Sequence, residues 1–484
     1  MTTPQADPTA EPLARYSKAQ TTTALPMRVP TRGELLRFAL PMMAGLLTMS
    51  LNTLIDVLFI GRLGTSALAA VPLAGIVYLI PGVLMQGLMR NAIAFCGRAH
   101  GAGRDGEIGG FLAQYRWLVL PAIPLLVLYG QAWPFFAWLG AVDAAVSELA
   151  QSYLLIRAWD IAPVMLVALY VAFYQAIGKT RFPMLIYALI LCTNALLDYG
   201  LIFGHFGLPA LGVEGSALAT VLAQSLGALA IMWATHSGRL RARFGLRLWA
   251  RPNPALLGSI LRVGLPQGLG DMADLGTWSA FTLIVGHLGR EALAATNIGM
   301  QLTQVIFLPG YAVGLAGASY MSRFLGAGRP DLAKAATVRS LWLAATYMGV
   351  MGLPLWFLGE RIAATFTTDA GVIWQAGLMF RVMAVYQVID CLGFVTRTTL
   401  GGAGDTRVPF LMLLASTLGV MLPGAWVLAR VVHPPIVGAW LGACAFMLVY
   451  AVLMLRRLHG GRWMHIVLHT TPRADGLPPT TPQG

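Results

Sequence analysis

The sequence has 484 residues, of which 57% are hydrophobic and only 11% are charged, whereas soluble domains carry about 25% charged residues. Apolar runs near the roughly 20 residues that a membrane-spanning helix needs recur along the whole chain. This composition excludes an ordinary soluble fold and predicts an all-α, polytopic membrane protein in contact with lipid. The net charge of +13 would suit a nucleic-acid-binding protein. The basic residues are spread between the apolar runs, however, so no nucleic-acid partner is expected.

The apolar runs predict twelve transmembrane helices in two sets of six. Residues 1–33 are polar and rich in Pro and Thr, which predicts a disordered cytoplasmic tail without a cleavable signal peptide. Helices 1–6 form a predicted N-lobe (34–236), and helices 7–12 form a predicted C-lobe (256–457). Residues 237–255 are the predicted cytoplasmic linker, and 458–484 are the predicted C-terminal tail. The expected spans are 35–60, 70–97, 112–139, 149–177, 183–204, 212–236, 256–286, 292–322, 338–358, 370–400, 408–431 and 436–456.

A segment at the start of each lobe occurs twice, at a constant offset of 225 residues. The first copy begins Arg37-Phe-Ala-Leu-Pro and reaches the Gly-Arg-Leu-Gly motif that ends at Gly64. The second begins Arg262-Val-Gly-Leu-Pro and reaches Gly-His-Leu-Gly, which ends at Gly289. The register still holds at the two Gly-Ala-Gly-Arg loops, which begin at Gly101 and Gly326, more than sixty positions after Arg37 and Arg262. Chance matching of Gly, Ala and Leu does not keep such a register, so the protein is a duplication.

The placement of positive charge predicts the orientation in the membrane. If the N-terminus is cytoplasmic, 26 of the 33 Lys and Arg residues fall in cytoplasmic segments and four fall in outside loops. The positive-inside rule therefore places both termini in the cytoplasm. Because each copy has six spans, both copies enter the membrane from the same side. The repeats are then related by an axis along the membrane normal, with the substrate path expected between them.

The repeated motifs resemble those of the multidrug and toxic compound extrusion (MATE) transporters. The resemblance covers essentially all of 34–457, and it is carried by the two proline-to-glycine segments, the two Gly-Ala-Gly-Arg loops and two further loops. These are Leu400-Gly-Gly-Ala-Gly-Asp-Thr-Arg-Val-Pro409 and its weaker partner Ala176-Ile-Gly-Lys-Thr-Arg-Phe-Pro183. The resemblance implies twelve helices in two six-helix lobes and antiport of organic compounds out of the cytoplasm.

Further expectations follow from this resemblance. H⁺ or Na⁺ would be the coupling ion, the substrate would be a small and cationic organic molecule, and the protein would be a monomer in a bacterial-type inner membrane. No cofactor is expected, because the four cysteines are scattered in apolar segments without metal-ligand spacing. The chain contains no H-E-x-x-H, G-x-S-x-G or P-loop sequence, so nothing indicates an enzyme.

Three polar residues of the predicted N-lobe form a candidate coupling site. Asp56 and Asp198 lie at similar depth on the first and fifth spans, and Asn194 is one turn before Asp198 on the same helix face. A carboxylate inside the membrane costs about 2.5–3.5 kcal/mol on insertion scales, and its charged form is disfavoured in a low-dielectric medium, so it can bind and release a proton. This group resembles the cation site of the DinF-like branch. Its alternative role is to tie helices together by hydrogen bonds.

The predicted C-lobe carries a second set of acids. Asp274 and Asp390 match positions at which NorM-like members carry acidic residues, so they are a second candidate cation-coupling site. Asp271, one turn before Asp274, shares its face. The acids of both branches are therefore present, and the sequence leaves open which lobe couples. The candidate lining of the substrate cavity, through polar and cation–π contacts, is Asp271, Gln267, Trp278, Phe307 and Tyr311, with Phe281 beside them; the alternative for the aromatic residues is ordinary packing.

Two arginines inside the predicted spans call for an explanation. Arg157 is three residues before Asp160, a spacing that predicts an ion pair at the outer end of the fourth span. Arg90 lies eight residues, about 12 Å, before Arg98 at the cytoplasmic end. We predict that Arg90 extends its side chain to that interface. Pairing with Asp56 is not expected, because the two residues lie toward opposite faces of their helical hairpin.

Two other functions would also suit a helical membrane protein of this size. A lipid-linked oligosaccharide flippase of the same superfamily would favour a wide basic cavity, whereas here the acids inside the spans outnumber the arginines. A membrane receptor or scaffold without transport predicts that neutralising Asp56, Asp198, Asp274 and Asp390 leaves substrate flux unchanged.

Overall fold

The computed structural model describes residues 28–468, and within this range the secondary structure is helical and contains no strand. Of the predicted tails, 1–27 and 469–484 lie outside the described residues. Helix α2 begins at Arg32, inside the predicted N-terminal tail, because Thr31 and Glu34 form a capping box that satisfies the first backbone N–H groups. The last long helix ends at His459, and a short 3₁₀ turn, Arg462–His465, follows it.

The N-lobe contains six spans, four of which include a break or a short 3₁₀ turn. The second span is divided at Asn91 between α3 and α4, and the third is divided at Leu118 between α5 and α6. The fourth span is interrupted by a 3₁₀ turn at Ala158–Asp160. The elements are α2 (Arg32–Ile60), η2 (Gly61–Leu63), α3 (Thr65–Arg90), α4 (Ala92–Gly101), η3 (Asp105–Glu107), α5 (Ile108–Trp117), α6 (Val119–Gln131), α7 (Trp133–Leu139), α8 (Ala144–Arg157), η4 (Ala158–Asp160), α9 (Ile161–Ala176), α10 (Arg181–Phe203) and α11 (Gly212–His236).

The predicted linker contains the six-residue helix α12 (Gly238–Arg243), and the C-lobe follows it. The C-lobe elements are α13 (Pro254–Gly286), α14 (Arg290–Gly326), α15 (Pro330–Ala364), α16 (Ala370–Gly402), α17 (Arg407–Ser416), the π-helical turn η5 (Thr417–Met421), α18 (Leu422–Val431), α19 (Pro435–His459) and η6 (Arg462–His465). α13 begins two residues before the predicted lobe boundary, because Asn253 caps it and Pro254 occupies its first turn.

Eleven of the described helical segments are long and apolar enough to cross a membrane. The segment missing from those eleven is α13, although it is 33 residues long. It carries Arg262, Asp271 and Asp274 within its length, and these charges lower its hydropathy. The chain is therefore a multi-pass membrane protein of twelve long helical segments in two lobes, and its least apolar helix is one that carries candidate site residues.

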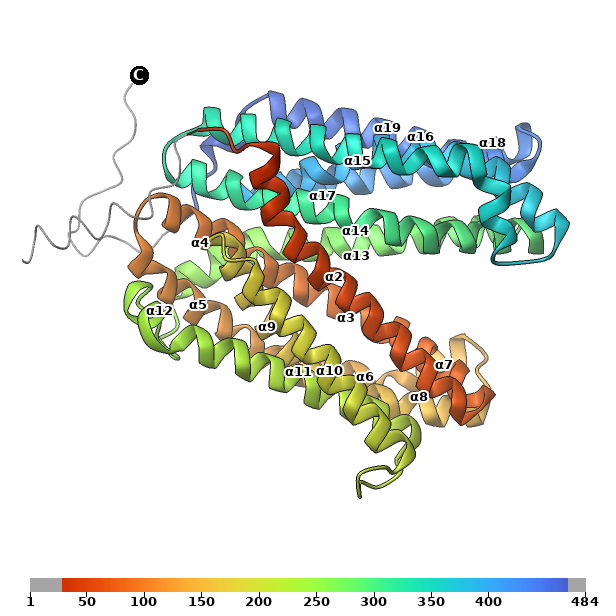
Figure 1. The fold of residues 1–484 in the computed structure, drawn as a ribbon, viewed down its shortest axis with the longest axis horizontal. Coiled ribbons are helices and arrows are strands. Elements are labelled where there is room, and N and C mark those ends of the chain that lie inside the picture. The colour runs from red at the N-terminus through yellow and green to blue at the C-terminus, as the bar shows by residue number, and fades with distance from the viewer. Residues whose placement is uncertain (1–27, 469–484) are drawn as a thin grey trace, which may run out of the picture.

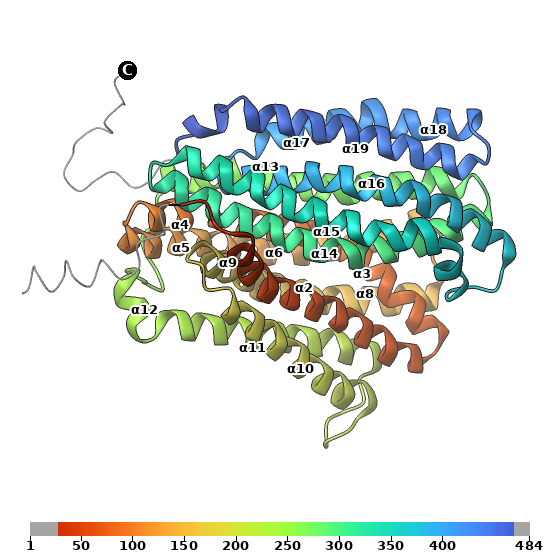
Figure 2. The same cartoon turned by 45° about the horizontal axis from the view of Figure 1, so that its top comes forward.

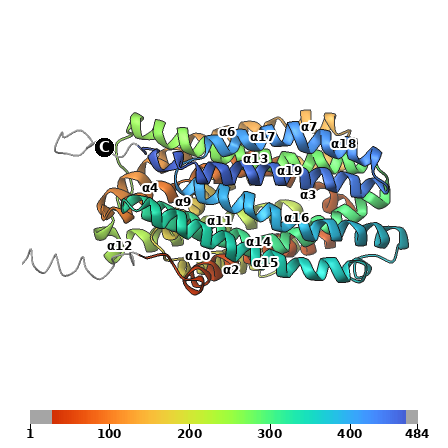
Figure 3. The same ribbon diagram turned by 90° about the horizontal axis from the view of Figure 1, so that it is seen from above.

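The two lobes lie side by side along the length of the bundle. In Figures 1 and 2 α15–α19 occupy one side and α9–α11 the other, and Figure 3 shows the long axes running in a common direction. The ribbons of the lobes lie close at the end that carries α4, α5 and α12, and they diverge toward the opposite end (Figure 1). Equivalent turns have the same geometry in both lobes, since φ is 112° at Gly64 and 117° at Gly289.

The first helix of each lobe crosses to the other lobe. Leu35, Phe38 and Met42, in the first half of α2, belong to the C-lobe core, whereas the second half of α2 packs on α10. The first half of α13 does the reverse, because Ile260 and Val263 belong to the N-lobe core. Each crossing helix contains a proline at an equivalent position, Pro41 and Pro266. The predicted lobe boundaries at 34 and 256 therefore do not coincide with the packing of the cores.

Candidate functional site

The candidate N-lobe site is built by α2, α10 and α11. Asp56 lies near the end of α2, and Asn194 and Asp198 lie one turn apart on α10. Asn194 and Asp198 are fully buried at 0% exposure, and Asp56 is partly buried. The structure thus brings together the three residues that the sequence predicted, and we call them the N-lobe acid group.

The amide of Asn194 connects the two acids. With its nitrogen facing the carboxyl groups, Asn194 donates to Asp56 Oδ1 at 2.8 Å and to Asp198 Oδ2 at 3.1 Å. Asn52, one turn before Asp56, donates to Asp56 Oδ2 at 3.4 Å. Sequence analysis missed Asn52, although its spacing of four residues from Asp56 was a usable signal.

One amide nitrogen, that of Asn194, reaches both carboxyl groups of the N-lobe acid group, so the two groups adjoin each other. Oδ1 of Asp198 and the hydroxyl of Ser216 on α11 are both buried without a hydrogen-bond partner in the described part of the chain. Two carboxylates this close repel each other strongly when both are ionised. A proton or a metal cation held between them removes that repulsion, so the arrangement is suited to binding one cation reversibly.

The ion pair predicted between Arg157 and Asp160 is confirmed, with Arg157 Nη1 at 3.3 Å from Asp160 Oδ2. Tyr78 donates to the same oxygen at 3.4 Å, and the guanidinium of Arg157 lies 4.8 Å from the centre of the Tyr78 ring. Asp160 is fully buried. This pair stabilises the interrupted fourth span, and the salt bridge of Arg157 is made with Asp160.

The candidate C-lobe site has a different composition. Asp271 and Asp274 lie one turn apart on α13, as predicted, and both accept from Arg397 on α16. The Arg397 Nη2 to Asp271 Oδ1 distance is 2.5 Å, and the Arg397 Nη1 to Asp274 Oδ2 distance is 3.5 Å. Gln267 donates to Asp271 Oδ1 at 3.3 Å. We call Asp271, Asp274, Arg397 and Arg90 the C-lobe charge cluster.

The prediction for Arg90 is wrong. Its side chain does not extend to the membrane interface; Nη2 binds Asp271 Oδ2 at 2.5 Å, and Nη1 donates to the Tyr311 hydroxyl at 2.7 Å. The reason is the close crossing of α3 and α13, where a Cβ on Gly268 would lie 2.2 Å from the carbonyl oxygen of Leu84. This crossing places Arg90 beside the second oxygen of Asp271, whose first oxygen binds Arg397, so an ion pair joins the two lobes.

Arg397 is one of the 26 Lys and Arg residues assigned to cytoplasmic segments by the charge count, and the structure places its side chain inside the bundle instead. Its side chain is only 11% exposed, and it lies within the length of α16. Five residues separate the end of α16 from Arg397. From the sequence, a charged residue so close to a predicted helix end is expected at the membrane interface. The packing of α13 near α16 shows instead that Arg397 faces Asp271.

Asp390 lies on α16, two turns before Arg397, and it is 8% exposed. Within the described residues no hydrogen bond or ion pair is found at its carboxyl group, and Asp274 is close enough to act on it electrostatically. The side chain of Asp274 is 41% exposed. The structure therefore places these two acids in one region, with Asp390 buried and Asp274 accessible.

The predicted cavity aromatics fall into two groups. Phe307 and Tyr311 stack at 5.7 Å between ring centres, next to the Arg90–Asp271 pair through Tyr311. Trp278 packs instead inside the C-lobe, with ring centres 5.8 Å from both Phe281 and Tyr386. Ordinary packing thus describes Trp278 and Phe281 well, whereas Tyr311 contacts the charges between the lobes.

No group of three or more His, Cys, Asp and Glu residues that could hold a metal ion occurs in residues 28–468. The cysteines there are free. The polar chemistry inside the spans of the described chain therefore consists of carboxyl, amide, hydroxyl and guanidinium groups, which suit protons, alkali cations and organic cations better than transition metals.

Comparison with known proteins agrees with the predicted resemblance. The MatE family model matches residues 41–200 and 278–427. The chain is 29% identical over 433 residues to the multidrug resistance protein NorM of Burkholderia vietnamiensis, covering 87% of this chain and 92% of that protein. It is 29% identical over 395 residues to the multidrug resistance protein PmpM of Pseudomonas aeruginosa, covering 81% and 82%.

Solved structures show the same fold. A structure described as MATE in complex with MaD5 has a TM-score of 0.78 at 20% identity, covering 88% of this chain and 96% of that one. A transporter of the MOP superfamily from Pyrococcus furiosus, described as having a binding pocket of reverse polarity, has a TM-score of 0.77 at 21% identity, covering 88% and 95%. The motif resemblance is confirmed, and this chain belongs to the MatE family.

Proposed function

We propose that this protein is a secondary active multidrug exporter that moves small cationic or amphiphilic organic molecules out of the cytoplasm in exchange for H⁺ or Na⁺. Support comes from the relatives named as multidrug resistance proteins and from the acids inside the spans. In this proposal the protein is a monomer of a bacterial-type inner membrane. Both termini face the cytoplasm, as the positive-inside rule predicts.

The observation that carries the proposal is the pair of carboxyl groups in the N-lobe acid group. The amide nitrogen of Asn194 lies 2.8 Å from Asp56 Oδ1 and 3.1 Å from Asp198 Oδ2, so it donates to both acids. No arginine forms a salt bridge with either acid in the described chain, whereas Asp271 and Asp274 both bind Arg397. We therefore assign ion coupling to the N-lobe, with Asp390 as the remaining unpaired acid of the C-lobe.

The substrate path proposed lies between the lobes, beside the C-lobe charge cluster. Asp274 is accessible there and is the carboxylate that Arg397 holds less closely, at 3.5 Å against 2.5 Å for Asp271. The stacked rings of Phe307 and Tyr311 supply flat aromatic surface. A flat organic cation can bind such a surface by stacking and cation–π contact. Gln267 and Asp271 line the same region through their contacts with Arg90 and Arg397.

Coupling requires only that each ligand has different affinities for the two conformations. In the described conformation Arg90 binds Asp271 across the lobes. A change to the second transport conformation would therefore have to break or rearrange this contact between α3 and α13. Binding of the coupling ion at Asp56 and Asp198 would change the packing of the outer part of α2 on α10. Because the first half of α2 packs in the C-lobe core, that change can reach the other lobe.

The flippase alternative has weaker support. The N-lobe acid group is anionic, and the basic side chains of the C-lobe charge cluster are already paired with carboxylates. These features suit a cation rather than the phosphate of a lipid-linked sugar. A receptor or scaffold gives no role to Asp198, which is fully buried with one oxygen unpaired.

The test is dye uptake into everted membrane vesicles under an imposed pH or Na⁺ gradient. We expect wild-type vesicles to accumulate an organic cation with one of the gradients. Asp56→Asn and Asp198→Asn should remove the gradient-driven part of uptake. Asp274→Asn should weaken substrate binding, and Asp390→Asn should leave coupling largely intact.

Asp143→Asn is the matched control, because Asp143 is an exposed helix-capping acid of the same lobe. Its variant should transport like wild type. Failure of every compound to move with either gradient would refute antiport. Loss of coupling in Asp390→Asn, with coupling kept in Asp198→Asn, would move the coupling site to the C-lobe.

A further inference from the structure

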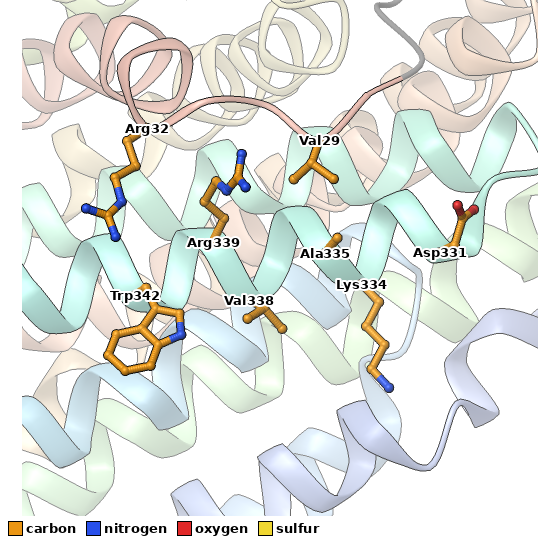
Figure 4. Close-up of a pocket in the computed structure, with 8 residues that line it drawn as sticks. All are labelled: Val29, Arg32, Asp331, Lys334, Ala335, Val338, Arg339 and Trp342. Atoms are coloured by element: carbon orange, nitrogen blue, oxygen red, sulfur yellow. The ribbon is translucent and has the colours of Figure 1, made fainter.

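A cavity of about 590 Å³ lies between the segment that leads into α2 and the first turns of α15. Figure 4 shows this chain segment passing over α15 with the lining side chains around it. The cavity is at the end of the bundle where both ends of the described chain lie (Figure 1). We call it the basic groove, and its lining consists of Val29, Arg32, Asp331, Lys334, Ala335, Val338, Arg339 and Trp342.

The basic groove carries an excess of positive charge. Its one acid, Asp331, is held by Arg329 at 2.6 Å, so it does not neutralise the groove. Within residues 28–468 no carboxylate pairs with Arg32, Lys334 or Arg339, although Arg339 donates to the carbonyl oxygen of Pro30 at 2.9 Å. Three cationic side chains from two segments therefore line this hollow without a carboxylate partner, and Figure 4 shows Arg32 and Arg339 on one side of α15 and Lys334 on the other.

The groove also has an apolar side. Trp342 lies eight residues beyond Lys334 on α15, about 12 Å toward the middle of the helix. Trp342 is 65% exposed, and Val338, one turn before it on the same face of α15, also lines the groove. Tryptophan is enriched at the level of lipid headgroups, where its ring meets both apolar chains and polar groups.

We propose that the basic groove binds one anionic phospholipid. The phosphodiester lies among Arg32, Lys334 and Arg339, and an acyl chain runs over Val338 and Trp342. Basic clusters at the ends of membrane helices attract anionic headgroups, and the adjacent tryptophan selects a ligand with an apolar part over free phosphate. Because the ligand touches both α2 and α15, it stabilises the docking of the first half of α2 on the C-lobe.

The test is native mass spectrometry of the full-length protein in detergent, titrated with phosphatidylglycerol or phosphatidylcholine. Each basic residue near the membrane surface contributes roughly a fivefold factor in lipid affinity. The variant Arg32→Gln/Lys334→Gln/Arg339→Gln is therefore expected to bind phosphatidylglycerol about 100-fold more weakly than wild type. The double variant Arg32→Gln/Lys334→Gln keeps the Arg339–Pro30 hydrogen bond, and it should bind the lipid about 30-fold more weakly.

The control variant Arg239→Gln/Arg241→Gln/Arg247→Gln removes the same charge from exposed positions after α11. It should bind phosphatidylglycerol like wild type, and phosphatidylcholine should bind all variants equally weakly. Equal weakening in the control would show a general surface attraction and overturn the proposal. Competition by glycerol 1-phosphate at the same concentration as the lipid would show a soluble-phosphate site and would also overturn it, as would unchanged binding in the double variant.

Discussion

The two lobes share one helical arrangement, but the acidic residues inside them have different hydrogen-bond and ion-pair partners. In the N-lobe acid group, Asp56 and Asp198 are bridged by the amide of Asn194. In the C-lobe charge cluster, Asp271 is bound by two guanidinium groups, and one of them comes from the other lobe. An acid bridged by neutral donors keeps a charge for a mobile cation, whereas an acid bound by arginine is already neutralised.

The duplication explains the shared frame and the different chemistry. At the offset of 225 residues, Asp56 corresponds to Phe281, and Asp271 corresponds to Leu46. Phe281 packs against Trp440 at 5.2 Å between ring centres, as a core residue does. The repeat thus preserved the helices, the crossing of α2 and α13 and their turns, while the charged positions diverged. Two residues at equivalent positions of the repeat therefore need not have the same role.

The largest effect that we predict is at Asp198. Asp198→Asn leaves one carboxyl group in the N-lobe acid group, so a proton or cation is no longer needed to relieve repulsion between two acids. We expect gradient-driven uptake in everted vesicles to fall by about 100-fold, near the upper range of coupling energies. Substrate binding measured without a gradient should change little. A variant that still couples uptake to the gradient would show that the N-lobe acid group is structural.

The α3–α13 crossing should tolerate substitution less well than the rest of α13. A Cβ at Gly268 would meet the Leu84 carbonyl oxygen at 2.2 Å, whereas a Cβ at Gly258 on the same helix meets no atom within 4 Å. We expect Gly268→Ala to lower the free energy of unfolding by about 1–3 kcal/mol through overpacking. Gly258→Ala should leave it unchanged or raise it. Thermal unfolding of both variants in detergent measures the difference, and equal melting temperatures would contradict the close crossing.

Sequence patterns predicted most of the fold and about half of the site, for physical reasons. Twenty-residue apolar runs and the register of the repeat depend on local composition, so the spans and the lobes were predictable. The N-lobe acid group was predictable because Asn194 and Asp198 share a helix and Asp56 lies at matching depth. The arginine partners of Asp271 were not predictable, because Arg90 and Arg397 reach it only where α3 and α16 cross α13. Such crossings depend on distant glycines rather than on local pattern.

Breaking the Arg90–Asp271 ion pair between the lobes should have a smaller effect than the substitutions above. Arg90→Gln removes the bond between α3 and Asp271 but leaves Asp271 bound to Arg397. Because the Arg90 side chain is 33% exposed, we expect the balance between the conformations to shift by only about 1–2 kcal/mol. Spin labels at Arg62 and His287, equivalent positions at the diverging end, report this shift as a change in distance distribution.

The matched control for that experiment is Arg157→Gln. Arg157 also binds a carboxylate inside the spans, but its partner Asp160 belongs to the same lobe. Its loss should lower thermal stability without moving the two labels relative to each other. Distances that change in Arg157→Gln and stay constant in Arg90→Gln would show that the inter-lobe pair has no part in the conformational balance.

The smallest predicted effect comes from removing the side-chain amide that contacts the acids in each lobe. Gln267 donates to Asp271 at 3.3 Å, but two arginines already bind that carboxylate, so Gln267→Leu should lower uptake by no more than about twofold. Asn194→Leu removes a donor that reaches both acids of the N-lobe acid group, and it should lower gradient-driven uptake several times more. Similar losses in the two variants would mean that neutral donors matter equally in both lobes. The contrast between bridged and ion-paired acids would then not explain where the coupling ion binds.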